Sequence, residues 1–186
     1  VAGGTPRQLT NGPASESTPA WSPDSRAVAF VTDRDGISQV WEINASGGEA
    51  RKVTTLSTGA SKPLYSPDAK WIAFVSAVYP DLTTDSEQKA RIEAKAEEGV
   101  TARLIDHLLY RHWSSWEDGK KHHIMLIPAA GGDARDLTAG AYDQPARGDP
   151  SRGFAFSPDS KEICFSRAAA DSPAISTNSD LWKVDV

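Results

Sequence analysis

The side chains best suited to molecular recognition are gathered in one short stretch of the chain, at Arg111, His112, Trp113 and Trp116. Arginine and tryptophan dominate buried recognition surfaces, since each offers a large contact area together with hydrogen-bond donors. The simpler alternative is that the tryptophans pack against neighbouring helices. We expect these four residues to form a substrate-binding or domain-interface surface.

A second group with recognition chemistry is the acidic pair Glu97-Glu98, at the end of a helix-forming stretch. Two adjacent carboxylates could capture an amino group of a ligand. They could equally lie in solvent at the end of the helix, where charged pairs contribute little to stability.

No constellation for catalysis stands out. The chain has no Gly-x-Ser-x-Gly nucleophile motif, and its Gly-Gly pairs sit at predicted hairpin turns rather than before helices. The histidines lack metal-ligand spacing, and the adjacent His122 and His123 must point to opposite faces of a strand. Cys164, within an apolar run, is predicted to be a small buried hydrophobe. We therefore expect no catalytic residue, no metal site and no cofactor.

Composition narrows the class of partner. The 186 residues carry a formal charge of -5, and no Lys/Arg run exceeds two residues, which disfavours nucleic acid. No apolar segment approaches the roughly 20 residues that span a membrane. The compartment stays open between bacterial cytoplasm and periplasm, because one cysteine is compatible with both.

Two motifs recur along the chain and must position these groups. In the first, an aromatic residue precedes Ser-Pro-Asp and an apolar stretch, with copies beginning at Trp21, Tyr65 and Phe156. Proline presets the backbone for a tight turn, aspartate caps it, and the apolar stretch is typical of a buried strand. The second motif, Gly-Gly followed by Leu-Thr or Val-Thr, begins at Gly3, Gly47 and Gly131.

The spacing of both motifs indicates one structural unit. The first interval is 44 residues for each motif, which is the size of a four-stranded propeller blade. The sequence therefore predicts an all-β fold, a partial β-propeller of four-stranded antiparallel blades. The main alternative is a β-sandwich.

The next interval is longer by about 40 residues, which places one helical insertion at about residues 80–123. Thr84 and Glu87 are spaced as a capping box, so a helix is predicted over Glu87–Glu98 with Gly99 as its stop. A second helix is predicted over Thr101–Leu109, burying Leu104, Ile105, Leu108 and Leu109. Tyr110–Trp116 is then predicted as a strand that re-enters the blade.

Residues 1–186 then make up about three to three and a half blades of one propeller domain, whereas closed propellers have four to eight. The chain begins on the last strand of one blade, around Gly3–Thr10, and ends on the third strand of another, at Leu181–Val184. We expect a fragment of a larger propeller whose open blade edges promote self-association. Alternatively, the two ends share a blade, within one chain or between chains.

The Ser-Pro-Asp and Gly-Gly…Leu-Thr repeats resemble the WD-like propeller repeats of TolB and of the prolyl-oligopeptidase superfamily. The run Ala102–Trp113, followed by Trp116–Lys120, is similar to the N-terminal propeller of bacterial dipeptidyl aminopeptidase and acylaminoacyl-peptidase enzymes, and TolB lacks such an insertion. The resemblance implies a serine peptidase whose Ser-Asp-His triad lies in a separate α/β-hydrolase domain. No residue of that triad can be placed on this chain.

Two functions follow as hypotheses. The first is a non-catalytic propeller fragment of a serine exopeptidase or oligopeptidase that gates and positions peptide substrates for the hydrolase domain. The second is a TolB-like propeller that works through protein–protein contacts. The insertion favours the first hypothesis.

Overall fold

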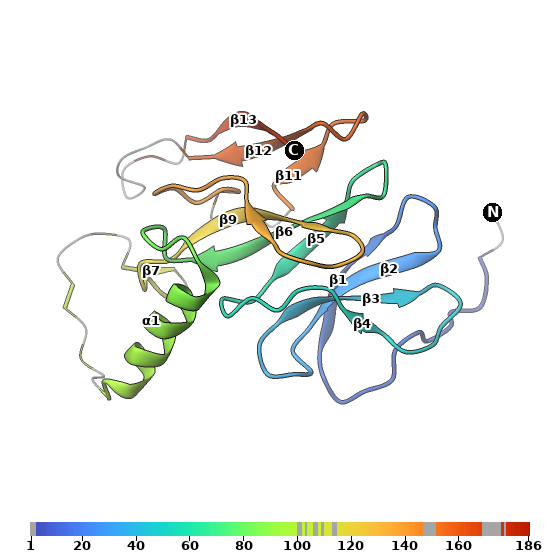
Figure 1. Ribbon diagram of the computed structural model, residues 1–186, viewed down its shortest axis with the longest axis horizontal. Helices are drawn as coiled ribbons and strands as arrows, with labels where there is room; N and C mark the ends of the chain where they lie inside the picture. Colours follow the sequence, from blue (N-terminus) through green and yellow to red (C-terminus); the bar gives the residue numbers. More distant parts are fainter. Residues whose placement is uncertain are drawn as a thin grey trace.

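The computed structural model describes residues 3–99, 102, 104–105, 108, 110–112, 115–146, 152–168, 176 and 178–186. Its main feature is three antiparallel sheets that follow one another along the chain, which we call blades A, B and C (Figure 1). Blade A contains β1 (Glu16–Trp21), β2 (Ala27–Thr32), β3 (Gln39–Asn44) and β4 (Arg51–Lys52). Blade B contains β5 (Ser61–Tyr65), β6 (Trp71–Val78), β9 (Lys121–Pro128) and β10 (Arg135–Asp136). Blade C contains β11 (Phe154–Phe156), β12 (Glu162–Arg167) and β13 (Asp180–Asp185). The predicted fold, a partial propeller of antiparallel blades, is confirmed.

The Ser-Pro-Asp turns have one geometry in all three blades. In blade B the Ser66 hydroxyl donates to Asp68 Oδ1 at 2.7 Å and accepts from the Trp71 N–H at 3.0 Å. The same carboxylate accepts the Lys70 N–H at 3.1 Å. Serine and aspartate together therefore satisfy the polar groups of the turn that joins the first two strands of each blade. The pKa of all three turn aspartates, Asp24, Asp68 and Asp159, is lowered. The hydrogen bond that each carboxylate accepts from the serine hydroxyl is the largest cause.

The Gly-Gly…Thr motif joins the third strand of a blade to the fourth. Gly47 and Gly48 have φ of +99° and +114°, which glycine adopts at the lowest cost. The threonine at the end of the motif turns back to the third strand: Thr54 Oγ1 accepts the Val40 N–H at 2.9 Å, and Thr138 Oγ1 accepts the Ile124 N–H at 2.8 Å.

The core lies between the blades. One buried cluster joins blades A and B and includes Val40, Ile72 and Phe74, while a second joins blades B and C and includes Ile124 and Phe165. Apolar residues on both faces of blade B are buried, which explains the nearly continuous apolar run of β6.

The N-terminal segment differs from the prediction. No strand forms over residues 3–10, although the sequence motif is that of a fourth strand. Leu9 instead packs on the outer face of blade A, and the Arg7 side chain donates to the carbonyls of Ala45 and Ser46. A strand needs a hydrogen-bonded neighbour, and none of the described strands pairs with this segment.

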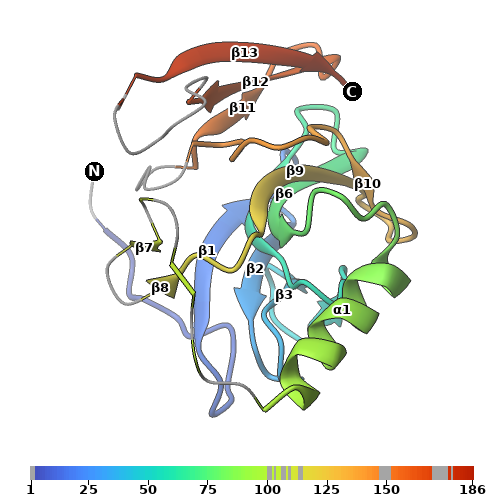
Figure 2. The same ribbon diagram turned by 90° about the vertical axis from the view of Figure 1, so that its left-hand side faces the viewer.

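The insertion begins as predicted. Helix α1 (Asp85–Glu97) starts at the N-cap Thr84 with a complete capping box to Glu87, and Gly99 follows its end with φ of +61°. Helix α1 lies beside blade B (Figures 1 and 2). The Thr84 hydroxyl, together with the backbone N–H groups of Thr84 and Thr83, lowers the pKa of the Glu87 carboxyl. Among the described residues no helix is long and apolar enough to cross a membrane.

The rest of the insertion contradicts two predictions. The predicted second helix is wrong: Leu104 is 94% exposed, Ile105 and Leu108 are also exposed, and Leu109 lies outside the described residues. A helix of nine residues is marginal in water unless an apolar face docks, and the side chains of Leu104, Ile105 and Leu108 are not buried against such a surface. The predicted re-entrant strand is also wrong, because β7 (Arg111–His112) and β8 (Ser115–Trp116) pair with each other and, among the described strands, with none of blade B.

Another prediction that proves wrong concerns Cys164 in blade C, which is exposed rather than buried. Its neighbours Ile163 and Phe165 face blade B and are buried, so the alternation along β12 turns Cys164 to the outer face of blade C.

A candidate binding pocket between the insertion and blade B

Helix α1 is anchored to the blade by buried polar contacts. The Gln88 side chain is buried, and its amide accepts the Tyr79 N–H at 2.9 Å and donates to the Tyr79 carbonyl at 2.9 Å. Asp85 accepts the backbone N–H and the hydroxyl of Ser57, each at 2.8 Å. Because these bonds satisfy buried backbone groups, they fix the position of the helix against the end of β6.

Tyr79, which directly follows β6, forms a buried aromatic floor beside this helix. Three cations lie over or around its ring: Lys95 Nζ at 4.7 Å, the Arg91 guanidinium carbon at 5.0 Å and Lys120 Nζ at 5.3 Å from the centroid. Arg91 also binds Asp81 at 2.8 Å, and this bond lowers the pKa of the Asp81 carboxyl.

Asp118 holds the two lysines beside the tyrosine. Its carbonyl accepts from Lys95 Nζ at 3.1 Å, and its carboxylate binds Lys120 Nζ at 3.2 Å. The Asp118-Gly119 turn, with φ of +86° at Gly119, therefore links the helix to the start of β9.

The hairpin of β7 and β8 presents a second aromatic surface. The rings of Tyr110 and Trp116 stack with centroids 6.2 Å apart and planes inclined by 26°. Arg111, paired in register with Trp116, places its guanidinium carbon 5.2 Å from that ring. Stacked aromatic rings flanked by a cation favour flat or apolar ligand groups.

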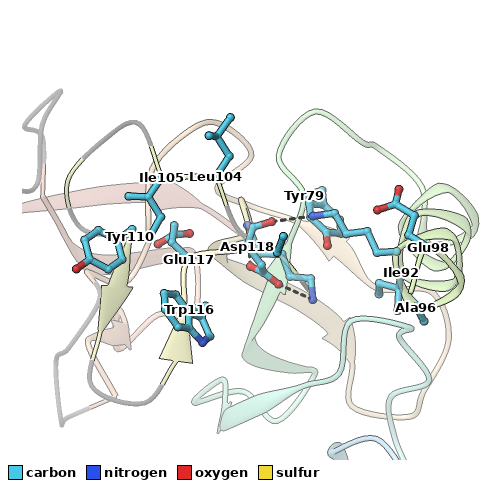
Figure 3. Close-up of a pocket in the computed structure, with 13 residues that line it drawn as sticks. Tyr79, Ile92, Ala96, Glu98, Leu104, Ile105, Tyr110, Trp116, Glu117 and Asp118 are labelled. Carbon is cyan, nitrogen blue, oxygen red and sulfur yellow. Dashed lines mark hydrogen bonds and ion pairs between the residues drawn. The ribbon is translucent and has the colours of Figure 1, made fainter. Parts of the chain in front are cut away.

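A cavity of about 690 Å³ opens between the helix and the hairpin. Figure 3 shows Tyr110, Trp116 and Ile105 on one side and Asp118 in the middle, with Ile92 and Ala96 of α1 and its C-cap Glu98 on the other side. The size suits a small ligand or a few residues of peptide. Among the described residues, no hydrogen bond or ion pair engages the Glu98 carboxylate at the rim.

Of the predicted site residues, the structure brings Arg111 and Trp116 together and places Trp116 in the wall of the pocket. His112 lies in β7, and Trp113 falls outside the described residues. Sequence reasoning missed the floor of the pocket, which is Tyr79 with Lys95 and Lys120. The sequence position of Tyr79 was the signal that could have identified it, because Tyr79 lies where the strand pattern of blade B ends and the insertion begins.

The adjacent histidines of β9 contact residues of blade B and of the loop that follows it, and they do not line the pocket. His123 is buried, with Nδ1 2.6 Å from Asp136 Oδ2 and Nε2 2.9 Å from the Gly140 carbonyl, while His122 is half-buried beside Asp143. The described part of the chain contains no group of three histidine, cysteine or carboxylate side chains placed to hold a metal ion.

The repeats match a known family model. Residues 1–105 match the model described as TolB beta propeller domain, which is more than half of the chain. The match covers blade A, the first two strands of blade B and helix α1. It ends before the hairpin of the insertion.

Among curated proteins, the chain is 28% identical over 193 aligned residues to dipeptidyl-peptidase 5 of Porphyromonas gingivalis. The alignment covers 95% of this chain and 26% of that protein, so the chain spans about a quarter of its relative.

Solved structures share the fold at lower identity. The putative TolB from Agrobacterium tumefaciens is 20% identical with a TM-score of 0.58, over 98% of this chain and 50% of that one. The acylaminoacyl peptidase of Pyrococcus horikoshii is 16% identical with a TM-score of 0.56, over 90% of this chain and 23% of that one.

Proposed function

The chain belongs to the TolB β-propeller domain family, and from that premise we propose that it is the non-catalytic propeller portion of a serine exopeptidase or oligopeptidase. In this role it gates access to a separate α/β-hydrolase domain and positions peptide substrates for it. The relationship to dipeptidyl-peptidase 5 along 95% of the chain supports the peptidase assignment.

The observation that carries the proposal is the pocket beside the insertion. Its stacked Tyr110 and Trp116 offer an apolar platform, and the Glu98 carboxylate lies across the opening from them (Figure 3). A peptide with a free N-terminus carries both matching groups, an apolar side chain for the aromatic platform and an ammonium for the carboxylate. The pocket therefore suits the N-terminal end of a peptide.

The test is a calorimetric titration of the protein with the tripeptide Ala-Phe-Ala-amide and with its N-acetylated form. A half-exposed ion pair contributes about 1 kcal/mol, so acetylation should weaken binding about fivefold. Glu98→Gln should cause a similar loss for the free amine and no further loss for the acetylated peptide. The adjacent Glu97→Gln is the matched control, because Glu97 does not line the pocket.

Trp116→Ala should weaken both peptides, since the aromatic platform is used whether or not the amine is free. Equal affinity of the two peptides for the unmodified protein, or the same response to Glu97→Gln and Glu98→Gln, would contradict the proposed recognition of the N-terminus.

The second candidate is a TolB-like propeller that binds other proteins. The family match favours it, because the matched residues 1–105 carry the blade repeat rather than the hairpin. The same titration separates the two functions: a protein-binding propeller without peptide recognition would bind neither tripeptide.

A further inference from the structure

Lys95 of helix α1 brings a positive charge into the pocket. Its Nζ lies 4.7 Å from the centroid of the buried Tyr79 ring and donates to the Asp118 carbonyl at 3.1 Å, a group without net charge. Within the described part of the chain, no ion pair engages this ammonium. An ammonium has three N–H donors, so Lys95 keeps donors for a ligand.

The two cations beside Lys95 have carboxylate partners. Arg91 binds Asp81 at 2.8 Å, and Lys120 binds the Asp118 carboxylate at 3.2 Å. A lysine in the last turn of a helix also complements the helix dipole, which would account for the residue type. It does not account for the direction of the side chain, because the ammonium donates to the turn before β9 rather than to a carbonyl of the helix. Lys95 is thus directed toward the floor of the pocket.

Glu98 places the opposite charge one turn further along the helix. It is the C-cap of α1, its backbone angles are helical, and its N–H donates to the Ala94 carbonyl at 3.1 Å. Residues three positions apart lie on the same face of a helix, and both Lys95 and Glu98 line the pocket. No ion pair joins the two among the described residues. The pocket therefore presents a cation and an anion about 5 Å apart along the helix axis.

Two opposite charges at this separation match a ligand that carries an amine and a carboxylate on one residue. In an N-terminal aspartate or glutamate, standard bond lengths put the free amine and the side-chain carboxylate within about 5 Å of each other. A ligand with a neutral first residue would remove water from the Lys95 ammonium without replacing its interactions, and this is unfavourable. The arrangement thus favours an acidic first residue.

The other carboxylates of the pocket lie away from this position or are paired. Asp118 binds Lys120, and Glu117 lies on the hairpin side of the pocket, where its N–H donates to the Tyr110 carbonyl at 2.8 Å (Figure 3). The chain as a whole carries a charge of -5, which disfavours acidic ligands in general. A preference for an acidic peptide must therefore come from a local cation.

We propose that the pocket selects peptides whose first residue is aspartate or glutamate, with the side-chain carboxylate bound by Lys95 and the free amine bound by Glu98. This inference rests on the proposed function, because the amine must be held at Glu98 for the carboxylate to reach Lys95. The stacked rings of Tyr110 and Trp116 then receive the side chain of the second residue.

The test is a calorimetric titration of the protein with Asp-Phe-Ala-amide and with Asn-Phe-Ala-amide, which have nearly the same shape and differ in one charge. Lys95 is partly exposed, so the aspartate peptide should bind about fivefold more tightly at low salt. The preference should shrink at about 0.5 M salt, because added ions screen such a pair.

Lys95→Gln should abolish the preference and keep the affinity for the asparagine peptide, since glutamine still offers an N–H to the Asp118 carbonyl. Lys89→Gln is the matched control. Lys89 lies on the same helix, binds Glu93 and does not line the pocket, and its replacement changes the net charge by the same amount. The control should keep the full preference. A preference that survives Lys95→Gln, or that is lost in Lys89→Gln, would overturn the proposal.

The N-acetylated forms of both peptides separate this inference from the proposed function. Weaker binding after acetylation, combined with equal affinities of the aspartate and asparagine peptides, would leave the amine site in place and overturn the carboxylate site. Unchanged affinity after acetylation would overturn both.

The peptide Asn-Phe-Ala with a free C-terminal carboxylate tests the other source of a carboxylate. We expect it to bind as its amide does. A gain as large as that of the aspartate peptide would show that the first residue is not selected, and the proposal would fail.

Discussion

The anchoring of the helix through Gln88 gives the sharpest test of how the pocket is built. Gln88→Ala removes the only side chain among the described residues that bonds both the N–H and the carbonyl of Tyr79. Without Gln88 the buried Tyr79 N–H loses its acceptor, which costs about 1–3 kcal/mol, whereas the Tyr79 carbonyl still accepts from the Leu82 N–H at 3.1 Å. We therefore expect α1 to dock about 2 kcal/mol less favourably, which corresponds to a roughly 30-fold shift in the docking equilibrium.

The assay is amide hydrogen exchange followed by mass spectrometry, with urea unfolding alongside. Exchange should rise over α1 and at Tyr79, while the buried strand pair β6 and β9 keeps its protection. The neighbouring Lys89→Ala, on the exposed side of the same helix, is the control and should leave exchange near Tyr79 unchanged. Unaltered exchange in Gln88→Ala would refute the reasoning that this side chain holds the helix.

Three further outcomes are expected. The lowered pKa of the three turn aspartates means that they stabilise the fold above their ordinary pKa of 3.8 and that this contribution is lost as pH falls through their lower folded values. The urea concentration at the unfolding midpoint should fall over that acidic range of pH. In a variant with all three aspartates replaced by asparagine, the midpoint should fall less steeply with pH. An equally steep fall in the variant would contradict this reasoning. Burial and the Glu42 carboxylate raise the pKa of Tyr65, so difference absorbance should show its phenol still protonated at a pH where exposed tyrosines ionise. Tyr65→Phe should lower the free energy of unfolding by about 1 kcal/mol, and an unchanged urea midpoint would count against the contact between blades. Gly48→Ala should cost about 1 kcal/mol because φ is +114°, whereas Gly12→Ala, with an ordinary φ and open space around it, should be nearly neutral in the same unfolding assay.

The sequence was a good guide wherever interactions are local. The Ser-Pro-Asp turn closes through bonds between residues at most five positions apart, such as Ser66 to Trp71. The capping box of Thr84 and Glu87 spans three positions. Contacts of this range depend on residue type and spacing alone, so the repeats, the blade size and the start of α1 could be predicted.

The candidate site was only partly predictable. Arg111 and Trp116 could be identified by residue type, and they do lie together. The pocket, however, also needs Tyr79 and Lys95, which lie about 40 and 20 residues earlier in the chain. Nothing in the spacing of these residues indicates that they meet.

The stretch after α1 shows how local pattern can mislead. The apolar residues at 104, 105 and 108 have helical spacing, yet Leu104 and Leu108 are exposed and no helix forms at the described positions. A helical pattern becomes a helix only where a surface is available to bury its apolar face, and that surface is a property of the whole fold.

What the sequence determined by itself is the repeating unit, because a blade is made of short-range turns and of strands adjacent along the chain. Only the tertiary structure decided which side chains of successive blades meet. The equivalent positions of Arg7 and Arg51, and the burial of Phe74 between blades A and B, depend on how the blades stack. Stacking buries a face where a neighbouring blade packs on it, so blade B, between blades A and C, is buried on both faces.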